Sequence, residues 1–138
     1  MRKIIMLMLT VLGLALQPLS AQNTEGSDNY KYYKAVELLD EGGDPQEARK
    51  LAVENIKANP KHIDSYLLIA GIDRREADYA SALRQIEQAM KNNHKDSGFS
   101  EALLLWWKAI IYDELCNTRK AVDTMEQVVK MARKTDKE

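Results

Sequence analysis

The chain has 138 residues and a formal net charge of −1, with 45% hydrophobic residues, 30% charged residues and one cysteine. This length allows one domain, and the composition is that of a folded protein, because disordered chains carry fewer apolar residues and more net charge. The near-neutral charge argues against a nucleic-acid binder, which must neutralise phosphates. A single cysteine excludes an intrachain disulfide and a cysteine-rich metal site.

Residues 1–21 have the order of a secretory signal peptide. Arg2 and Lys3 form a basic start, residues 4–16 carry no charge, and residues 17–21 end in small side chains. The apolar run is short for a membrane span, which needs about 20 apolar residues. An uncleaved N-terminal anchor is the alternative interpretation.

Cleavage after Ala21 would leave a mature chain of 117 residues with a net charge of −3. Leu19 stands three residues before this bond, where a small residue is preferred, so the sequence leaves the cleavage bond open. We expect an exported protein of the periplasm or cell envelope that contacts membranes only indirectly, with residues 22–28 as a flexible leader.

The remaining chain repeats itself. Ala48 and Ala82 are 34 residues apart, and each follows an aspartate, Asp44 or Asp78, by four residues. A third copy follows at Ala121, 39 residues after Ala82. Spacing of this kind is typical of proteins built from repeated supersecondary units.

Helix start and stop signals divide each repeat in two. Asp44 and Pro45 provide an N-cap acceptor and a proline at the first helical position, and Gly42 and Gly43 end the preceding helix. Further N-cap candidates are Asp78, Ser97 or Ser100, and Asn117. The predicted helices are at about residues 28–41, 45–58, 62–76, 79–92, 99–115 and 118–134.

Large and small residues follow one order in the three copies, at Tyr32, Ala35, Val36, Leu39, Ala48, Ala52 and Pro60; Tyr66, Ile69, Ala70, Asp73, Ala82, Ile86 and His94; and Leu105, Lys108, Ala109, Tyr112, Ala121, Met125 and Arg133. This order resembles the tetratricopeptide repeat, a helix pair of about 34 residues. The resemblance implies an all-α fold, an α-solenoid of about three antiparallel helix pairs. Another kind of helical array is the alternative.

The resemblance covers residues 29–134, with repeats at about 29–60, 63–94 and 102–134 and a tail at 135–138. In the third repeat, Lys108 falls on a position that is usually buried. If the repeat register of this helix is shifted by one residue, Trp106 takes the leading aromatic position of the repeat. Trp107 then replaces Trp106 among the groove residues. The sequence leaves this register open.

In tetratricopeptide repeats the first helices of the pairs line a concave ligand groove. Arg74 and Arg75 could bind an acidic group there, and Gly71 could admit a ligand backbone. The residues that the resemblance places on the groove are Tyr30, Tyr33, Glu37 and Asp40; Leu67, Gly71, Arg74 and Arg75; and Leu103, Trp106, Ile110 and Asp113. The alternatives are aromatic residues in the core, a solvated arginine pair at a helix end and Gly71 at a tight helix crossing.

The carboxylate clamp found in some members of this family is absent here. Its positions hold Tyr33, Glu37 and Leu67, which cannot bind a C-terminal carboxylate. We therefore do not expect binding of chaperone tails.

No pattern for catalysis, a cofactor or a metal is present in the sequence. His62 and His94 stand in loops, where we expect them to be solvated, and Cys116 ends an apolar helix, where we expect it to be semi-buried and inert. Asp73 belongs to a charge cluster at a helix end that we expect to face solvent. The sequence therefore predicts no catalytic, cofactor-binding or metal-binding residue.

The sequence thus favours a non-catalytic protein–protein interaction module, an adaptor or assembly factor that binds a peptide or protein segment and no nucleic acid. A self-associating structural protein is the second hypothesis, and a small enzyme is the third. A homodimer would use apolar residues of the last helix pair: Ile110, Ile111, Met125, Val128, Val129 and Met131.

Overall fold

A computed structural model describes residues 29–135, and over these residues the chain is all-helical, with no strand. Six α-helices pack in pairs within these residues, in agreement with the predicted all-α class and its helix pairs. Their bounds are α3 (Tyr30–Asp40), α4 (Pro45–Ala58), α5 (Ile63–Arg75), α6 (Tyr79–Asn92), α7 (Glu101–Glu114) and α8 (Thr118–Thr135). The predicted signal peptide (1–21), the leader (22–28) and the end of the tail (136–138) lie outside the described residues.

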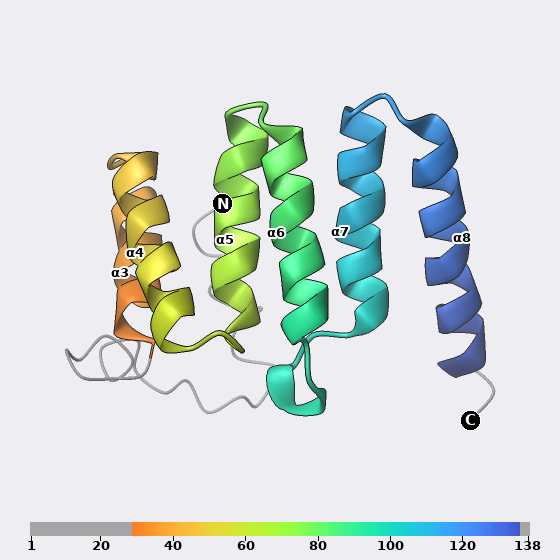
Figure 1. Cartoon of the computed structure of the whole chain (residues 1–138), viewed down its shortest axis with the longest axis horizontal. Coiled ribbons are helices and arrows are strands. Elements are labelled where there is room, and N and C mark those ends of the chain that lie inside the picture. Colours follow the sequence, from red (N-terminus) through yellow and green to blue (C-terminus); the bar gives the residue numbers. More distant parts are fainter. Residues whose placement is uncertain (1–28, 136–138) are drawn as a thin grey trace, which may run out of the picture.

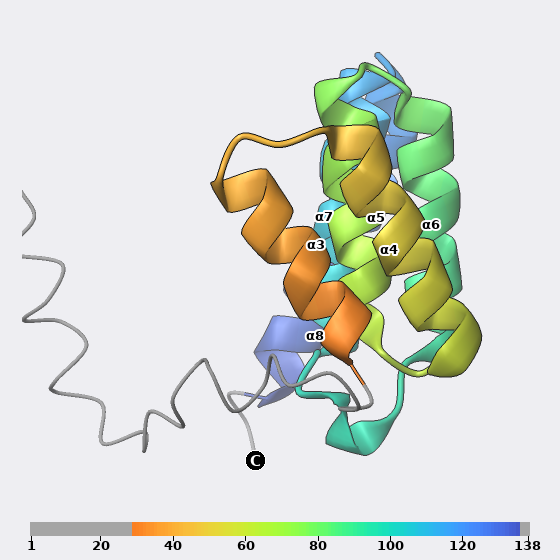
Figure 2. The ribbon, with the colours of Figure 1, turned by 90° about the vertical axis from the view of Figure 1, so that its left-hand side faces the viewer.

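The six helices stand side by side in a row, with α3 and α4 at one end and α8 at the other (Figure 1). The closest packing is within the pairs α3–α4, α5–α6 and α7–α8, and the second helix of one pair then packs on the first helix of the next. Seen from the end of the row, α4 and α6 lie toward the same side of the molecule, away from α3 (Figure 2). Short loops enforce this order, apart from a 3₁₀ turn at Lys95–Ser97 that the sequence did not predict.

Four predicted N-caps are confirmed. In each case a side-chain oxygen accepts a hydrogen bond from a backbone N–H of the first helical turn, which has no partner within the helix. The bonds run from Gln46 N to Asp44 (2.9 Å), from Ser81 N to Asp78 (3.0 Å), from Leu103 N to Ser100 (3.1 Å) and from Lys120 N to Asn117 (3.2 Å).

The first helix of each pair ends in the same way. Gly42, Ala77 and Cys116 follow α3, α5 and α7 in the left-handed region, with φ of 75°, 59° and 56°. The next backbone N–H bonds back to the carbonyl five residues earlier, at 2.8 Å in all three cases. Only the first turn has the glycine that this conformation favours. Cys116 is exposed there, so the expectation that it is semi-buried was wrong.

Small residues form much of the core of the helix pairs. Four alanines that the repeat pattern named, Ala48, Ala70, Ala82 and Ala109, are each at most 2% exposed, and so is Ala89 of α6. Large apolar side chains, above all Ile63, Ile69, Ile86, Leu104 and Ile111, fill the space between the helices.

The junction between α4 and α5 is held by buried polar groups. Asp73 is 0% exposed and forms an ion pair with Arg49, so the expectation that it faces solvent was wrong. Asn55 is also buried and donates to Ser65 Oγ at 3.1 Å. Asp73 lies on the face of α5 that meets α4, which is why its helix-end position did not expose it.

His62 is half-buried, with its side chain 12% exposed, so the expectation that it is solvated was wrong. Its ring centroid lies 4.7 Å from that of Tyr32, and its Nδ1 is 2.9 Å from Ser65 Oγ. Burial lowers the pKa of His62, although the nearby Asp64 carboxylate opposes this shift. Burial together with Asp64 also raises the pKa of Tyr32 to about 12. His94, by contrast, is exposed as predicted.

The third pair follows the first of the two registers considered. Leu105 and Ala109 are buried, whereas Trp106 is 41% exposed. Lys108 is half-buried because its ammonium leaves the core and lies 3.0 Å from Glu87 Oε1 of α6.

Candidate functional site

Exposed apolar residues lie along one side of α7. Leu103 and Trp106 are 38% and 41% exposed, and Ile110, seven residues after Leu103, is half-buried. This spacing places the three side chains on one face of the helix. Trp106 is therefore available to a ligand, while Trp107 packs against the core between α5, α6 and α7.

The predicted groove residues of α3 and α5 are all at least partly accessible. Tyr30, Tyr33 and Leu67 are half-buried, and Leu67 packs against two core clusters. Glu37 and Arg75 are exposed. We call the outward residues of α3, α5 and α7 that were predicted for the groove the first-helix face.

Gly71 does not stand at a tight helix crossing. A Cβ added to this residue would meet no atom within 4 Å, whereas one added to Gly43 would lie 2.4 Å from Leu38 Cδ1. A tight helix crossing at Gly71 is thus ruled out. The space above the α5 backbone at this residue is open, as the other interpretation requires.

Arg74 is engaged within the molecule. Its Nε and Nη2 donate to the two carboxylate oxygens of Glu114 at 2.8 and 2.5 Å, and its guanidinium lies 5.3 Å from the ring centre of Trp107. The bond to Glu114 raises the pKa of Arg74. Arg74 therefore joins α5 to α7, and of the predicted arginine pair only Arg75 is exposed.

A hollow runs between α7 and α8. Ile110 and Asp113 of the predicted groove lie in it, so the structure places these two residues beside α8. The other residues that line it are Ala109, Glu114, Thr118, Ala121, Val122 and Met125.

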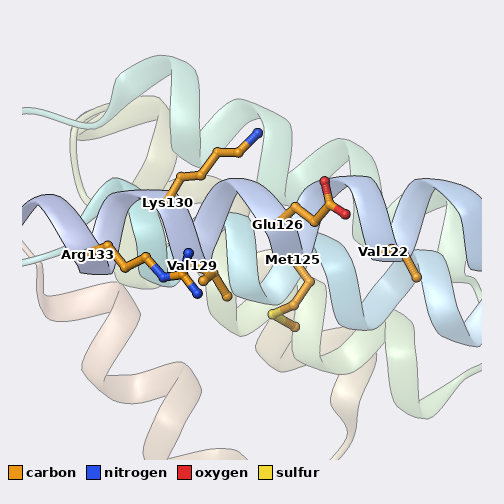
Figure 3. Close-up of a pocket in the computed structure, with 6 residues that line it drawn as sticks. All are labelled: Val122, Met125, Glu126, Val129, Lys130 and Arg133. Carbon is orange, nitrogen blue, oxygen red and sulfur yellow. The ribbon is translucent and has the colours of Figure 1, made fainter.

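A second hollow continues the first along α8. It shares Val122 and Met125 and extends over Glu126, Val129, Lys130 and Arg133. Figure 3 shows Met125 and Val129 on one side of the helix, with Glu126 and Lys130 projecting from the opposite edge. Val122 and Val129 are 52% and 43% exposed. We call the residues of the two hollows together the end face.

The end face corresponds to surfaces that are covered elsewhere in the molecule. By the spacing of the repeats, Val122, Met125 and Val129 of α8 match Leu83, Ile86 and Met90 of α6. The three residues of α6 belong to or pack against the core cluster that includes Ile111 of α7.

The first pair shows the same relation. The matching residues of α4 are Arg49, Ala52 and Ile56. Arg49 pairs with Asp73 of α5, Ala52 is 0% exposed, and Ile56 packs against the cluster of Ile63. The same three positions are thus covered on α4 and α6 and open on α8.

Charges of opposite sign mark the two ends of the end face. Asp113 and Glu114 lie with Thr118 at the start of α8, and Lys130 and Arg133 lie near its C-terminal end. Between them lie the apolar side chains of Val122, Met125 and Val129, with Glu126 at the edge. The sequence prediction missed Val122, Lys130 and Arg133, although the 39-residue spacing from Leu83 could have identified Val122.

A third hollow, formed by the α4–α5 and α6–α7 connections, is polar. It is lined in part by His62, Asp64, His94 and Asp96. Over residues 29–135 no three His, Cys, Asp or Glu side chains are close enough together to hold a metal ion. Within the same part of the chain, no helix has the length and apolar character that a membrane crossing requires.

The chain matches none of the protein-family models and none of the curated proteins with which it was compared.

Proposed function

We propose that this chain is a non-catalytic interaction module of the tetratricopeptide-repeat type, which acts as an adaptor or assembly factor in the cell envelope. The first-helix face binds a peptide or an extended segment of a protein partner. The observation that carries the proposal is the exposed apolar pair Leu103 and Trp106, because large exposed side chains of this kind are typical of protein contacts.

Two further observations support a ligand on this face. The backbone of α5 is open above Gly71, so a ligand main chain can approach it. Arg75 is exposed at the end of the same helix and can pair with an acidic group of the ligand. Arg74 has a different role, since its ion pair with Glu114 holds α5 against α7.

The helix-pair arrangement supports assignment to a solenoid. Each second helix packs on the first helix of the following pair, and the caps recur at matching positions. Such stacks present elongated faces on which ligands lie. The basic start and uncharged run of residues 1–21 support export, because they have the order of a signal peptide.

Site-specific photocrosslinking tests the binding face. A photoreactive amino acid is placed at Trp106 or at Gly71 of the full chain, which is then expressed in its own host and irradiated in intact cells. The matched control is the exposed Gln88 of α6. We expect discrete adducts from positions 71 and 106 and none from position 88. Equal adducts from position 88, or none from the other two, would refute this binding face.

The mass of the protein recovered from the envelope fraction tests export. We expect a mature chain that begins at or near Gln22. Recovery of the uncleaved chain in the cytoplasm would refute export while leaving the binding face to be judged by crosslinking.

A further inference from the structure

We propose that two copies of this chain pair through the end face, with their α8 helices antiparallel across a two-fold axis. This inference is argued separately from the first-helix face. It concerns α8 and the residues of α7 beside it, of which Ile110 and Asp113 belong to both surfaces. The apolar stretch Val122, Met125 and Val129 of each copy lies against that of the other.

The first step is that this surface is built to be covered. The matching positions of α4 and α6 each bind the first helix of the next pair. After α8 no further pair follows in the described residues, and Val122 is left 52% exposed where Leu83 packs against the core. Leaving these apolar side chains in water costs free energy, about 25 cal/mol for each Å² of apolar surface that could be buried.

The second step is that charge selects a second copy as the occupant. The end face is acidic at Asp113 and basic at Arg133, with Lys130 at its edge (Figure 3). The Glu114 carboxylate in the same hollow is already paired with Arg74. Antiparallel pairing brings the acidic end of one copy against the basic end of the other, twice. A two-fold interface uses the same patch on both subunits and therefore requires such self-complementarity.

The third step is that the dimensions suit this arrangement. α8 has 18 residues and is therefore about 27 Å long. Two such helices, each beside its own α7, form a four-helix contact in which the hollow between α7 and α8 of each copy accepts α8 of the other. Glu126 projects from the edge of the helix, so it can remain in water when the valines are covered (Figure 3).

Sedimentation equilibrium of the full chain, with residues 1–21 removed if export removes them, measures the association. We expect a dimer that the double variant Val122→Glu, Val129→Glu weakens at least about 30-fold in Kd, because each copy then buries two unpaired charges. The matched control is Leu115→Glu, which changes an equally exposed leucine outside the hollows and should leave Kd unchanged.

Charge reversal tests the antiparallel geometry. One variant carries Lys130→Glu and Arg133→Glu, and the other carries Asp113→Lys and Thr118→Lys. We expect each variant to self-associate more weakly than the parent chain, and an equimolar mixture to form heterodimers with an affinity near that of the parent.

Three results would overturn the proposal. The parent chain could remain monomeric at several hundred micromolar, the double glutamate variant could still dimerise, or the mixture could fail to recover. Far-UV circular dichroism of every variant must match that of the parent. Crosslinking from position 106 would remain informative in each case, so the failure of one proposal is distinguishable from the failure of the other.

Discussion

Helices α6 and α8 occupy the same place in consecutive pairs but have opposite surroundings. Ile86 of α6 is 0% exposed beneath α7, whereas the matching Met125 of α8 is half-buried in an open hollow. Both helices are N-capped in the same way and carry apolar residues at the same spacing. The difference therefore comes from their neighbours, because α7 packs on α6, whereas no helix of the described residues covers the outer face of α8.

Helix α4 adds a third case to this comparison. At the position of Leu83 and Val122 it carries Arg49, which is half-buried against Asp73. One position of the repeat thus supports an ion pair, an apolar contact or an open surface. Substitutions at matching positions of the three helices should have effects that follow the degree of covering.

The largest effect is expected at the covered ion pair. Arg49→Met leaves the carboxylate of Asp73 buried without its partner, and its Oδ2 already lacks a hydrogen bond in the described residues. We expect the free energy of unfolding to fall by about 3–5 kcal/mol. Urea denaturation measures this loss, and adding Asp73→Asn should recover part of it. A loss below about 1 kcal/mol would show that the pair is not needed to join α4 to α5.

The second largest loss of stability is expected at the apolar position shared by Ile86 of α6 and Met125 of α8. Ile86→Ala should cost about 2–5 kcal/mol, because it leaves a cavity between α6 and α7. Met125→Ala should cost less than about 1 kcal/mol when measured at concentrations where the chain is monomeric, because its site is open. Equal losses at the two sites would contradict the assignment of α8 as an uncovered helix.

The half-buried His62 and the exposed His94 should differ in how they affect the pH dependence of stability. His62 has a folded-state pKa below its usual 6.5 because it is buried, so protons bind more readily to the unfolded chain as the pH falls. The contribution of neutral His62 is therefore full above about pH 6.5 and is lost as the pH falls below this value.

Chemical denaturation at pH 7.5 and pH 5 measures the dependence. We expect His62→Gln to be less stable than the parent at pH 7.5 and to lose less stability on acidification. His94→Gln, at an exposed site, should retain the dependence of the parent. The assignment fails if His94→Gln removes the dependence and His62→Gln keeps it.

The smallest changes in stability are expected at the left-handed residue that follows the first helix of each pair. Ala77 and Cys116 adopt positive φ at positions where the first pair has Gly42. Ala77→Gly and Cys116→Gly should each stabilise the fold by about 0.5–1 kcal/mol, because glycine takes this conformation without the steric cost. Gly42→Ala should destabilise it by a similar amount. Thermal unfolding midpoints measure these shifts, and a lower midpoint for Ala77→Gly would contradict the shared helix ending.

Local signals made the helices predictable. Asp44, Asp78 and Asn117 cap helices because the acceptor and the first-turn N–H groups are neighbours in sequence. The alanine spacing likewise predicted the small buried positions Ala48 and Ala82, whereas the third alanine of the series, Ala121, is half-buried and lines the hollow between α7 and α8.

Contacts between pairs were less predictable. Asp73 stands among charged residues near a helix end, and only its place on the face of α5 toward α4 explains why it is buried. Arg74 was expected to meet a ligand but meets Glu114, a residue 40 positions later in the sequence. Local sequence does not specify which side chains from separate helices will meet, so the candidate site was only partly anticipated.

Amide hydrogen exchange, followed as protein concentration is raised, tests the central claim that α8 presents a surface built for covering. We expect α8 to exchange faster than α6 in dilute solution, because its outer face is open, and to slow markedly at concentrations where two copies pair. Exchange in α4 and α6 should not change. Protection of α8 that equals that of α6 at every concentration would contradict the account.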